Sequence, residues 1–107
     1  MNNGKILVYI TAASMEEGNK IAKHLVENKL AACCNIIPEI RSIYKWEGKI
    51  CDDKEVLIIV KSVKNSFYYI VEEVRKIHSY SVPEIICVDI TDGFSDYMNW
   101  IEEEVTG

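Results

Sequence analysis

Two hydrophobic periodicities alternate along the chain and predict strands separated by helices. Nearly continuous apolar runs at residues 5–11, 56–60 and 85–91 are typical of strands buried on both faces. Residues 14–28 and 65–79 instead carry apolar side chains at three- and four-residue steps, which indicates amphipathic helices. The pattern therefore predicts a mixed α+β chain.

Polar residues mark the expected starts of the helices. Ser14 and Glu17 form a capping box at the first helix, and Asn65 is a candidate cap of the second. Ser95 or Asp96 is expected to cap a short closing helix. Its apolar residues are expected to share one side: Tyr97, Trp100, Ile101 and Val105.

Residues 30–62 are predicted to form one long β-hairpin that reverses at Glu47 and Gly48. Both arms are rich in Ile, Val, Tyr and Trp, which suit a pleated, half-buried surface. Pro38 cannot donate a ladder hydrogen bond, so it marks a bulge or a bend. Because the arms are longer than the other strands, the far end is expected to project or to meet another chain.

A two-residue turn would place Cys51 opposite Tyr44 and Cys34 opposite Lys61. No cysteine then faces another, and no pair has the C-x2-C spacing of a zinc knuckle. Reduced, mostly buried thiols in a reducing compartment are therefore expected. The four cysteines are Cys33, Cys34, Cys51 and Cys87.

The order β-α-β-β-α-β, followed by a terminal helix, predicts one ferredoxin-like domain over residues 1–107. This α+β sandwich should have a long protruding hairpin and both main helices on one face of the sheet. The opposite face would lack a helix, although the strands are apolar on both sides. A closed homo-oligomer is the simplest way to cover that face.

Composition excludes some classes of partner. With 49% hydrophobic and 27% charged residues, the chain is an ordinary globular protein. Its net charge of -5 argues against a nucleic-acid partner, which basic surfaces bind. No apolar run approaches the roughly 20 residues that span a bilayer. Residues 1–10 also lack the features of a signal peptide, so a cytoplasmic protein with no membrane partner is expected.

Four short motifs are distributed over the whole chain: LAACCNI at residues 30–36, SIYKWEGK at 42–49, HSYSVPE at 78–84 and DYMNW at 96–100. Together they resemble the CutA divalent-cation tolerance proteins, in which the motifs come in the same order. The resemblance implies a ferredoxin-like protomer in a tight, PII-like homotrimer whose neighbours exchange hairpins. It also implies a role in tolerance of copper and other divalent cations.

The chain departs from the family pattern at two places. The family's His-Pro-Tyr is His78-Ser79-Tyr80 here, which loosens the turn after the second helix. Some bacterial members carry a cysteine late in the first strand, proposed as a copper ligand, where this chain has Ile10. A metal site built on that cysteine does not carry over.

His78 and Glu84 are the first candidate metal ligands, with Cys33 as a third. Imidazole, carboxylate and thiolate together suit copper or zinc, and a trimer can bring ligands from neighbouring chains into one cleft. The alternative is structural: His78 continues the apolar stripe of the second helix and caps its C-terminus, and Cys33 is core packing. His24, on the polar face of the first helix, is expected to be a solvated surface histidine.

Aromatic residues around the hairpin tip predict either a ligand cleft or a subunit interface. Tyr44, Trp46 and Lys49 surround the tip, Tyr80 follows His78, and Lys61 can close a cleft between protomers. Such a cluster suits a small anionic ligand, but large rings on a projecting arm are also what subunit packing needs. The residues expected at a trimer interface are Ser42, Tyr44, Trp46 and Trp100.

The sequence offers no recognisable enzyme chemistry. It lacks a nucleophile elbow and a P-loop, and its two arginines, Arg41 and Arg75, lie outside any Gly-rich loop. We therefore expect a non-enzymatic protein, without an obligatory cofactor, that binds copper or another divalent cation weakly. The alternative is a PII-like sensor or assembly scaffold that binds a small anionic ligand between protomers.

Overall fold

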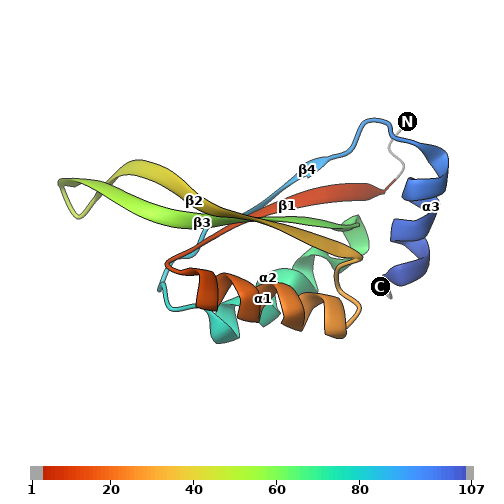
Figure 1. Cartoon of the computed structure of the whole chain (residues 1–107), viewed down its shortest axis with the longest axis horizontal. Coiled ribbons are helices and arrows are strands. Elements are labelled where there is room, and N and C mark those ends of the chain that lie inside the picture. The colour runs from red at the N-terminus through yellow and green to blue at the C-terminus, as the bar shows by residue number, and fades with distance from the viewer. Residues whose placement is uncertain (1–3, 106–107) are drawn as a thin grey trace.

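The computed structural model describes residues 4–105 and shows a four-stranded antiparallel sheet with three α-helices (Figure 1). Along the chain the elements are β1 (Lys5–Ala12), α1 (Met15–Glu27), β2 (Cys33–Trp46), β3 (Lys49–Val63), a 3₁₀ turn (Lys64–Ser66), α2 (Phe67–Ile77), β4 (Ile85–Asp89) and α3 (Ser95–Glu104). The strands lie in the order β2-β3-β1-β4. The predicted α+β class and the β-α-β-β-α-β order are confirmed.

The helices α1 and α2 lie side by side on one face of the sheet (Figure 1). Alternate side chains of β1 and β3 point into this layer, where Ile6, Val8 and Ile58 are fully buried. Ile70 and Val74 of α2 belong to the same cluster. Burying an aliphatic side chain of this size contributes about 1.5–3 kcal/mol. This covered face is therefore the main hydrophobic core of the described chain.

The opposite face of the sheet is largely uncovered. Ile86 and Val88 of β4 alternate with the core-facing Cys87, and they are 51% and 43% exposed. Ile37 of β2 is 40% exposed. We call this side the open face. Its exposed aliphatic side chains confirm the prediction that the sheet is apolar on both sides but covered by the two main helices on only one.

The closing helix α3 packs against one end of the sheet (Figure 1). Ile101 is fully buried, and Lys5 Nζ of β1 lies 2.9 Å from the Glu102 carboxylate. The residues of the predicted apolar side differ in burial: Ile101 and Val105 are 0% and 6% exposed, whereas Tyr97 and Trp100 are 41% and 37% exposed. Tyr97 lies one turn before Ile101 and Trp100 directly before it, so both rings flank the buried side of the helix.

The hairpin turn is confirmed at Glu47 and Gly48, with φ of +51° and +80°. Two positive φ values match the tight turn that follows the twist of the strands, and glycine adopts the second without steric cost. β1 pairs with β3 only as far as Ala12 and Val56. Beyond that point β2 and β3 pair only with each other and form the predicted projecting ribbon (Figure 1).

The predicted irregularity at Pro38 is also confirmed, because the β2–β3 register shifts between Ile37 and Ile40. Cys51 lies opposite Tyr44 as predicted. The prediction that Cys34 lies opposite Lys61 is wrong. The bulge inserts an extra residue, so Cys33 pairs with Lys61 and Cys34 with Val60.

The cap of α1 is confirmed: Ser14 Oγ accepts a hydrogen bond from Glu17 N at 3.1 Å. Glu17 reaches back and accepts from Ala13 N at 3.0 Å. The cap predicted for the second helix is wrong, because Asn65 lies within the 3₁₀ turn that precedes α2. The chain changes direction within this turn after β3, and α2 begins without a side-chain cap.

The cap predicted for the closing helix is also wrong. α3 begins at Ser95, its cap position is Phe94, and no side chain accepts a hydrogen bond there. Asp92, two residues earlier, instead accepts from Gly93 N at 2.8 Å. α3 is therefore held by its buried face and by Lys5 rather than by a local cap.

Candidate functional site

A hollow of about 550 Å³ lies where the base of the projecting ribbon meets the loop between α2 and β4. We call it the hairpin hollow. It is lined by Thr11, Ser42, Ile43, Tyr44, Trp46, Glu55, Tyr80, Ser81, Val82 and Glu84. The lining comes from β1, β2, β3 and the α2–β4 loop, so segments far apart in the sequence meet here.

The strand period explains why Ser42, Tyr44 and Trp46 reach the hollow, whereas Ile43 borders it from the other side of β2. Ser42, Tyr44 and Trp46 alternate along β2 and share one side of the ribbon. Glu55, at the start of the core-facing part of β3, pairs with Ile40 and shares that side. This is the open side of the sheet, because Glu55 is two residues from Leu57 and alternates with the core-facing residues of β3.

Two tyrosines of the hollow donate hydrogen bonds to carboxylates. Tyr44 Oη donates to Asp53, and this bond raises the pKa of Tyr44 to about 12. Tyr80 Oη donates to Glu55 Oε2 at 2.7 Å. Burial, and then this hydrogen bond, raise the pKa of Tyr80. Both phenols therefore keep their protons at neutral pH, and each proton is directed at a carboxylate.

His78 lies two residues before Tyr80 but faces a closed environment. Its side chain is fully buried. Nε2 lies 2.7 Å from the Thr11 carbonyl oxygen, and Nδ1 accepts from Tyr80 N at 3.0 Å. Because a carbonyl oxygen can only accept, Nε2 carries the proton and Nδ1 is the acceptor. Both ring nitrogens are occupied within the chain.

The neighbourhood of His78 also fixes the loop that leads into the hollow. His78 N donates to Val74 O at 2.9 Å, which closes α2. Glu17 Oε2 accepts from Ser79 N at 2.7 Å. Burial favours a raised pKa for Glu17, but hydrogen bonds from Ala13 and Ser79 outweigh it and lower the pKa. His78 and Glu17 thus anchor the loop to β1 and α1, and the His78 ring bonds β1 and the loop rather than, as the capping interpretation expected, the last carbonyl groups of α2.

The three predicted metal ligands do not come together within the chain. His78 contacts Thr11, which pairs with Leu57, whereas Cys33 pairs with Lys61, four residues along β3 and roughly 13 Å away. Cys33 Sγ lies 3.9 Å from Lys61 Nζ. Within residues 4–105 no group of three or more His, Cys, Asp or Glu side chains is arranged to hold a metal ion. A metal centre of His78, Glu84 and Cys33 therefore does not fit one protomer.

The residues expected in a cleft between protomers divide around this hollow of a single chain. Tyr44, Trp46 and Tyr80 line the hollow, but Lys49 and Lys61 do not. Glu84, predicted as a metal ligand, lines it as well. The two lysines lie outside the hollow for different reasons. Lys61 lies near the C-terminal end of β3, beside Cys33. Lys49 lies beyond Trp46, at the hairpin turn.

The residues predicted for a trimer interface divide between two places. Ser42 lines the hollow together with Tyr44 and Trp46. Trp100 lies in α3, where its ring centroid is 5.5 Å from that of Tyr97. The described chain thus separates a ribbon cluster from an α3 cluster.

Sequence reasoning missed several lining residues: Thr11, Ile43, Glu55, Ser81 and Val82. Glu55 carried the clearest signal. It ends the polar run before the apolar part of β3, yet it is only 8% exposed. A buried carboxylate needs a hydrogen-bond partner, and the sequence did not reveal that Tyr80 supplies it.

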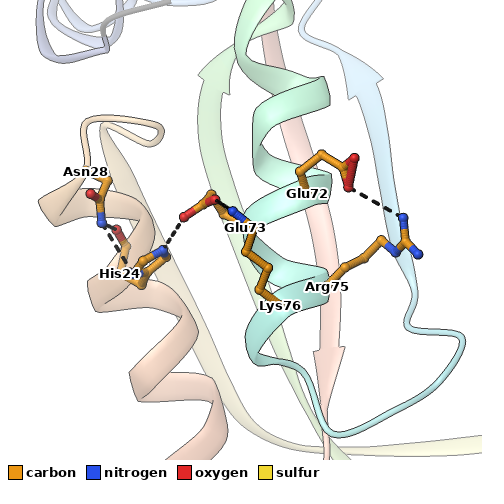
Figure 2. A network of polar contacts seen from close by, with 6 residues as sticks. All are labelled: His24, Asn28, Glu72, Glu73, Arg75 and Lys76. Atoms are coloured by element: carbon orange, nitrogen blue, oxygen red, sulfur yellow. Dashed lines mark hydrogen bonds and ion pairs between the residues drawn. The ribbon is translucent and has the colours of Figure 1, made fainter.

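A second depression, of about 950 Å³, lies beside α1 and α2 near Asn28, Tyr69 and Glu73. Its charged groups are paired (Figure 2): Glu73 binds His24 Nε2 at 2.9 Å and Lys76 Nζ at 2.7 Å, and Glu72 accepts from Arg75 at 3.4 Å. The expectation that His24 is simply solvated is therefore corrected, since it joins α1 to α2. Because the charges of this depression already pair with one another, the hairpin hollow is the better candidate site.

Comparison with known proteins identifies the family. Residues 6–104 match the family described as CutA1 divalent ion tolerance protein. The chain belongs to the CutA family. The divalent-cation tolerance protein CutA of Thermus thermophilus is 43% identical over 97 residues, which cover 91% of this chain and 94% of that protein. The Archaeoglobus fulgidus protein of the same name is 46% identical over 98 residues, covering 92% and 95%.

Solved CutA structures share the fold over nearly the whole chain. The CutA1 structure from Oryza sativa has a TM-score of 0.94 at 37% identity and covers 98% of this chain and 96% of that one. The Thermus thermophilus structure has a TM-score of 0.93 at 41% identity, covering 95% and 99%. CutA proteins are named as tolerance proteins and not as enzymes.

The length of CutA relatives varies. This chain spans 53% of the Arabidopsis thaliana relative named Protein CutA, chloroplastic. The Archaeoglobus fulgidus structure is named a periplasmic divalent cation tolerance protein. Among residues 4–105, no helix has the length and apolar character needed to cross a bilayer.

Proposed function

We propose that this CutA-family chain is a non-enzymatic protein that binds a small ligand in the hairpin hollow and thereby contributes to divalent-cation tolerance. The observation that carries the proposal is the convergence of three aromatic side chains, Tyr44, Trp46 and Tyr80, around an open cavity. Glu55 and Glu84 supply charge at the same place. Apolar walls with a few directed polar groups are the usual make-up of a ligand site.

The test of this proposal is a nuclear magnetic resonance titration with small molecules of both charge signs. Ligand-induced shifts should concentrate on the Trp46 indole and on Tyr80, while the Trp100 indole in α3 serves as an internal control. Shifts spread evenly over both tryptophans, or no shifts with any compound, would contradict a site in the hollow.

We further propose that the protein forms a PII-like homotrimer through its open face. The exposed Ile37, Ile86 and Val88 form an apolar surface that a second copy can cover. The projecting ribbon is free to reach a neighbouring chain, as the CutA resemblance implies. In that assembly the hairpin hollow would open toward the interface between protomers, with Ser42 and Trp46 near the neighbour.

Sedimentation equilibrium tests the trimer. The expected mass is about three times the 12.3 kDa of one chain. Val88→Asp on the open face should dissociate the assembly. Val26→Asp on α1 is the matched control, because the two valines are 43% and 42% exposed. A stable monomer at micromolar concentration, or equal effects of both variants, would contradict the proposed interface.

Copper or another divalent cation is the second candidate ligand, favoured by the name of the family. Weak binding is proposed, with no obligatory metal, because the hollow offers only Glu55 and Glu84 as acidic lining groups and His78 has no free nitrogen. Calorimetry with Cu²⁺ should therefore show a heat that Glu84→Gln reduces and Cys33→Ser leaves unchanged. If a folded His78→Ala variant loses the heat of Cu²⁺ binding, the result would instead support a metal site at His78.

A small anion, the alternative expected from the sequence, is disfavoured by the charge of the lining. Lys49 and Lys61, which were expected to bind the anion, do not reach the hollow.

We also propose that the protein works in the cytoplasm. Its four cysteines are unpaired, and burial raises the pKa of the Cys34 thiol to about 12, so that this sulfur stays protonated. Fractionation of the source cells would test the location.

A further inference from the structure

We infer that the hairpin hollow selects a small organic cation that carries a primary ammonium group. This inference rests on the proposed function, since it names the ligand class of the same site. It replaces the anion expected from the sequence with a ligand of the opposite charge. Three properties of the lining lead to it: the sign of its charges, the direction of its hydrogen bonds and the exposure of its rings.

The charges of the hollow are negative. Glu55 and Glu84 line it, and Asp53 lies directly behind Tyr44 as its hydrogen-bond acceptor. No lysine or arginine of residues 4–105 is part of the lining. Lys49 pairs with Trp46 at the turn but stays outside. An anion would enter this cavity against like charges, whereas a cation would be attracted.

The hydrogen bonds of the two phenols have the same consequence. Tyr44 directs its proton at Asp53, and Tyr80 directs its proton at Glu55. Each phenol oxygen can then only accept a further hydrogen bond. Carboxylates at neutral pH also only accept. The neutral hydroxyl groups of the lining can adapt in either direction: Thr11, Ser42 and Ser81. The directed polar groups therefore require a ligand that donates.

The aromatic rings provide the third contribution. Within one protomer Trp46 and Tyr44 are 47% and 42% exposed, so their surfaces border the hollow and face its opening toward a neighbouring chain. A cation over an indole or phenol face is attracted by the ring quadrupole, and tryptophan gives the strongest contact. A primary ammonium combines this attraction with three N–H donors for the carboxylate and phenol oxygens. A quaternary ammonium lacks the donors and would leave those oxygens unsatisfied.

The probes are 1,4-diaminobutane, tetramethylammonium, succinate and Cu²⁺, each titrated into the assembled protein while Trp46 fluorescence is followed. Trp100→Phe provides a background in which Trp46 is the only tryptophan. We expect diaminobutane to bind more tightly than tetramethylammonium and succinate not to bind. Raising the salt concentration should weaken diaminobutane binding, because screening reduces attraction between charges at the surface.

Two variants localise the effect. Glu84→Gln should weaken diaminobutane binding by roughly tenfold, the loss expected for one charge-assisted hydrogen bond. Glu27→Gln on α1, outside the hollow, should leave the affinity unchanged. Circular dichroism of both variants checks that the fold is retained.

The outcomes separate the ligand class from the proposed function. Succinate or Cu²⁺ binding at Trp46 without diaminobutane binding would overturn the ammonium inference and leave the hollow as a binding site. Tetramethylammonium binding as tightly as diaminobutane, or equal effects of Glu84→Gln and Glu27→Gln, would also overturn it. If no probe perturbs Trp46, both the inference and the proposed site fall.

Discussion

The two faces of the sheet differ in how far the chain itself covers them. On the covered face, Val8 and Ile58 are fully buried beneath α1 and α2. On the open face, Ile86 and Val88 stay half-exposed, and the hairpin hollow lies at the ribbon end of the same side. One chain therefore covers only one of the two apolar faces of its sheet. The buried core of the chain lies on the first face, and we propose that assembly and ligand binding use the second.

The loop after α2 repeats this contrast within three residues. His78 turns inward, where Thr11 O and Tyr80 N occupy both ring nitrogens. Tyr80 turns toward the hollow and meets Glu55. A histidine that resembles a metal ligand in the sequence is thus a structural anchor, and it places the tyrosine that forms the candidate site.

The largest expected effect is on the covered face. Ile58→Ala should lower the free energy of unfolding by about 2–5 kcal/mol, because it leaves a cavity among fully buried neighbours. Urea denaturation followed by circular dichroism measures the loss. Ile86→Ala, on the open face and 51% exposed within one protomer, is the matched control and should cost clearly less, because its own chain does not enclose it. Equal losses would show that the faces do not differ in the way described.

His78→Ala comes next. It leaves the Thr11 carbonyl and the Tyr80 amide without their partner, at a cost of about 1–3 kcal/mol for each buried group. Thermal unfolding measures the effect. His24→Ala is the control, since that ring is 32% exposed and pairs with Glu73 at the surface, and it should cost much less. If the His78→Ala protein were as stable as the wild type, His78 would not be a structural anchor.

Tyr80→Phe should have a smaller effect, about 1 kcal/mol, through loss of the hydrogen bond to the poorly exposed Glu55. Tyr44→Phe removes a similar bond to Asp53 on the exposed ribbon and should leave the unfolding midpoint unchanged. Chemical denaturation of the two variants side by side measures the difference. The reverse order would mean that the ribbon, and not the inner end of the hollow, determines local stability.

The smallest effect is the acid response of Glu17. Its pKa is lowered in the folded chain despite burial, by hydrogen bonds from Ala13 and Ser79. Its contribution is therefore present above the ordinary value of 4.5 and is lost as the pH falls through the lower folded pKa. Glu17→Gln should be less stable than the wild type near neutral pH. Melting curves at decreasing pH should show the two proteins converging, and a constant difference would contradict the assignment.

Much of the fold could be predicted because its signals are local. The periodicity of residues 14–28 specifies α1, Ser14 marks its start, and Glu47-Gly48 specifies the turn. The failures are also physical. Asn65 has the chemistry of a cap, but the 3₁₀ turn moved the start of α2 beyond it. Pro38 was correctly interpreted as a bulge, yet its one-residue shift was not carried into the cysteine register.

The candidate site was predicted less completely than the fold. Tyr44, Trp46 and Tyr80 were expected in a cleft between protomers, and the structure places all three around one hollow of a single chain. Its acidic character was not foreseen, because the sequence does not show that Glu55 and Glu84 lie beside the same hollow. Residue type alone does not show which way a charge faces when strand and loop meet.

The sequence by itself determined the elements, their order, the reversal of the hairpin and the membership of the CutA family, because these depend on short-range patterns and motifs. Only the tertiary structure decided that His78 is enclosed, that Cys33 lies far from it, and that Glu55 and Glu84 line the hollow with the aromatic rings. Those features depend on contacts between distant segments. Strand pairing and loop anchoring set such contacts, and local patterns do not encode them.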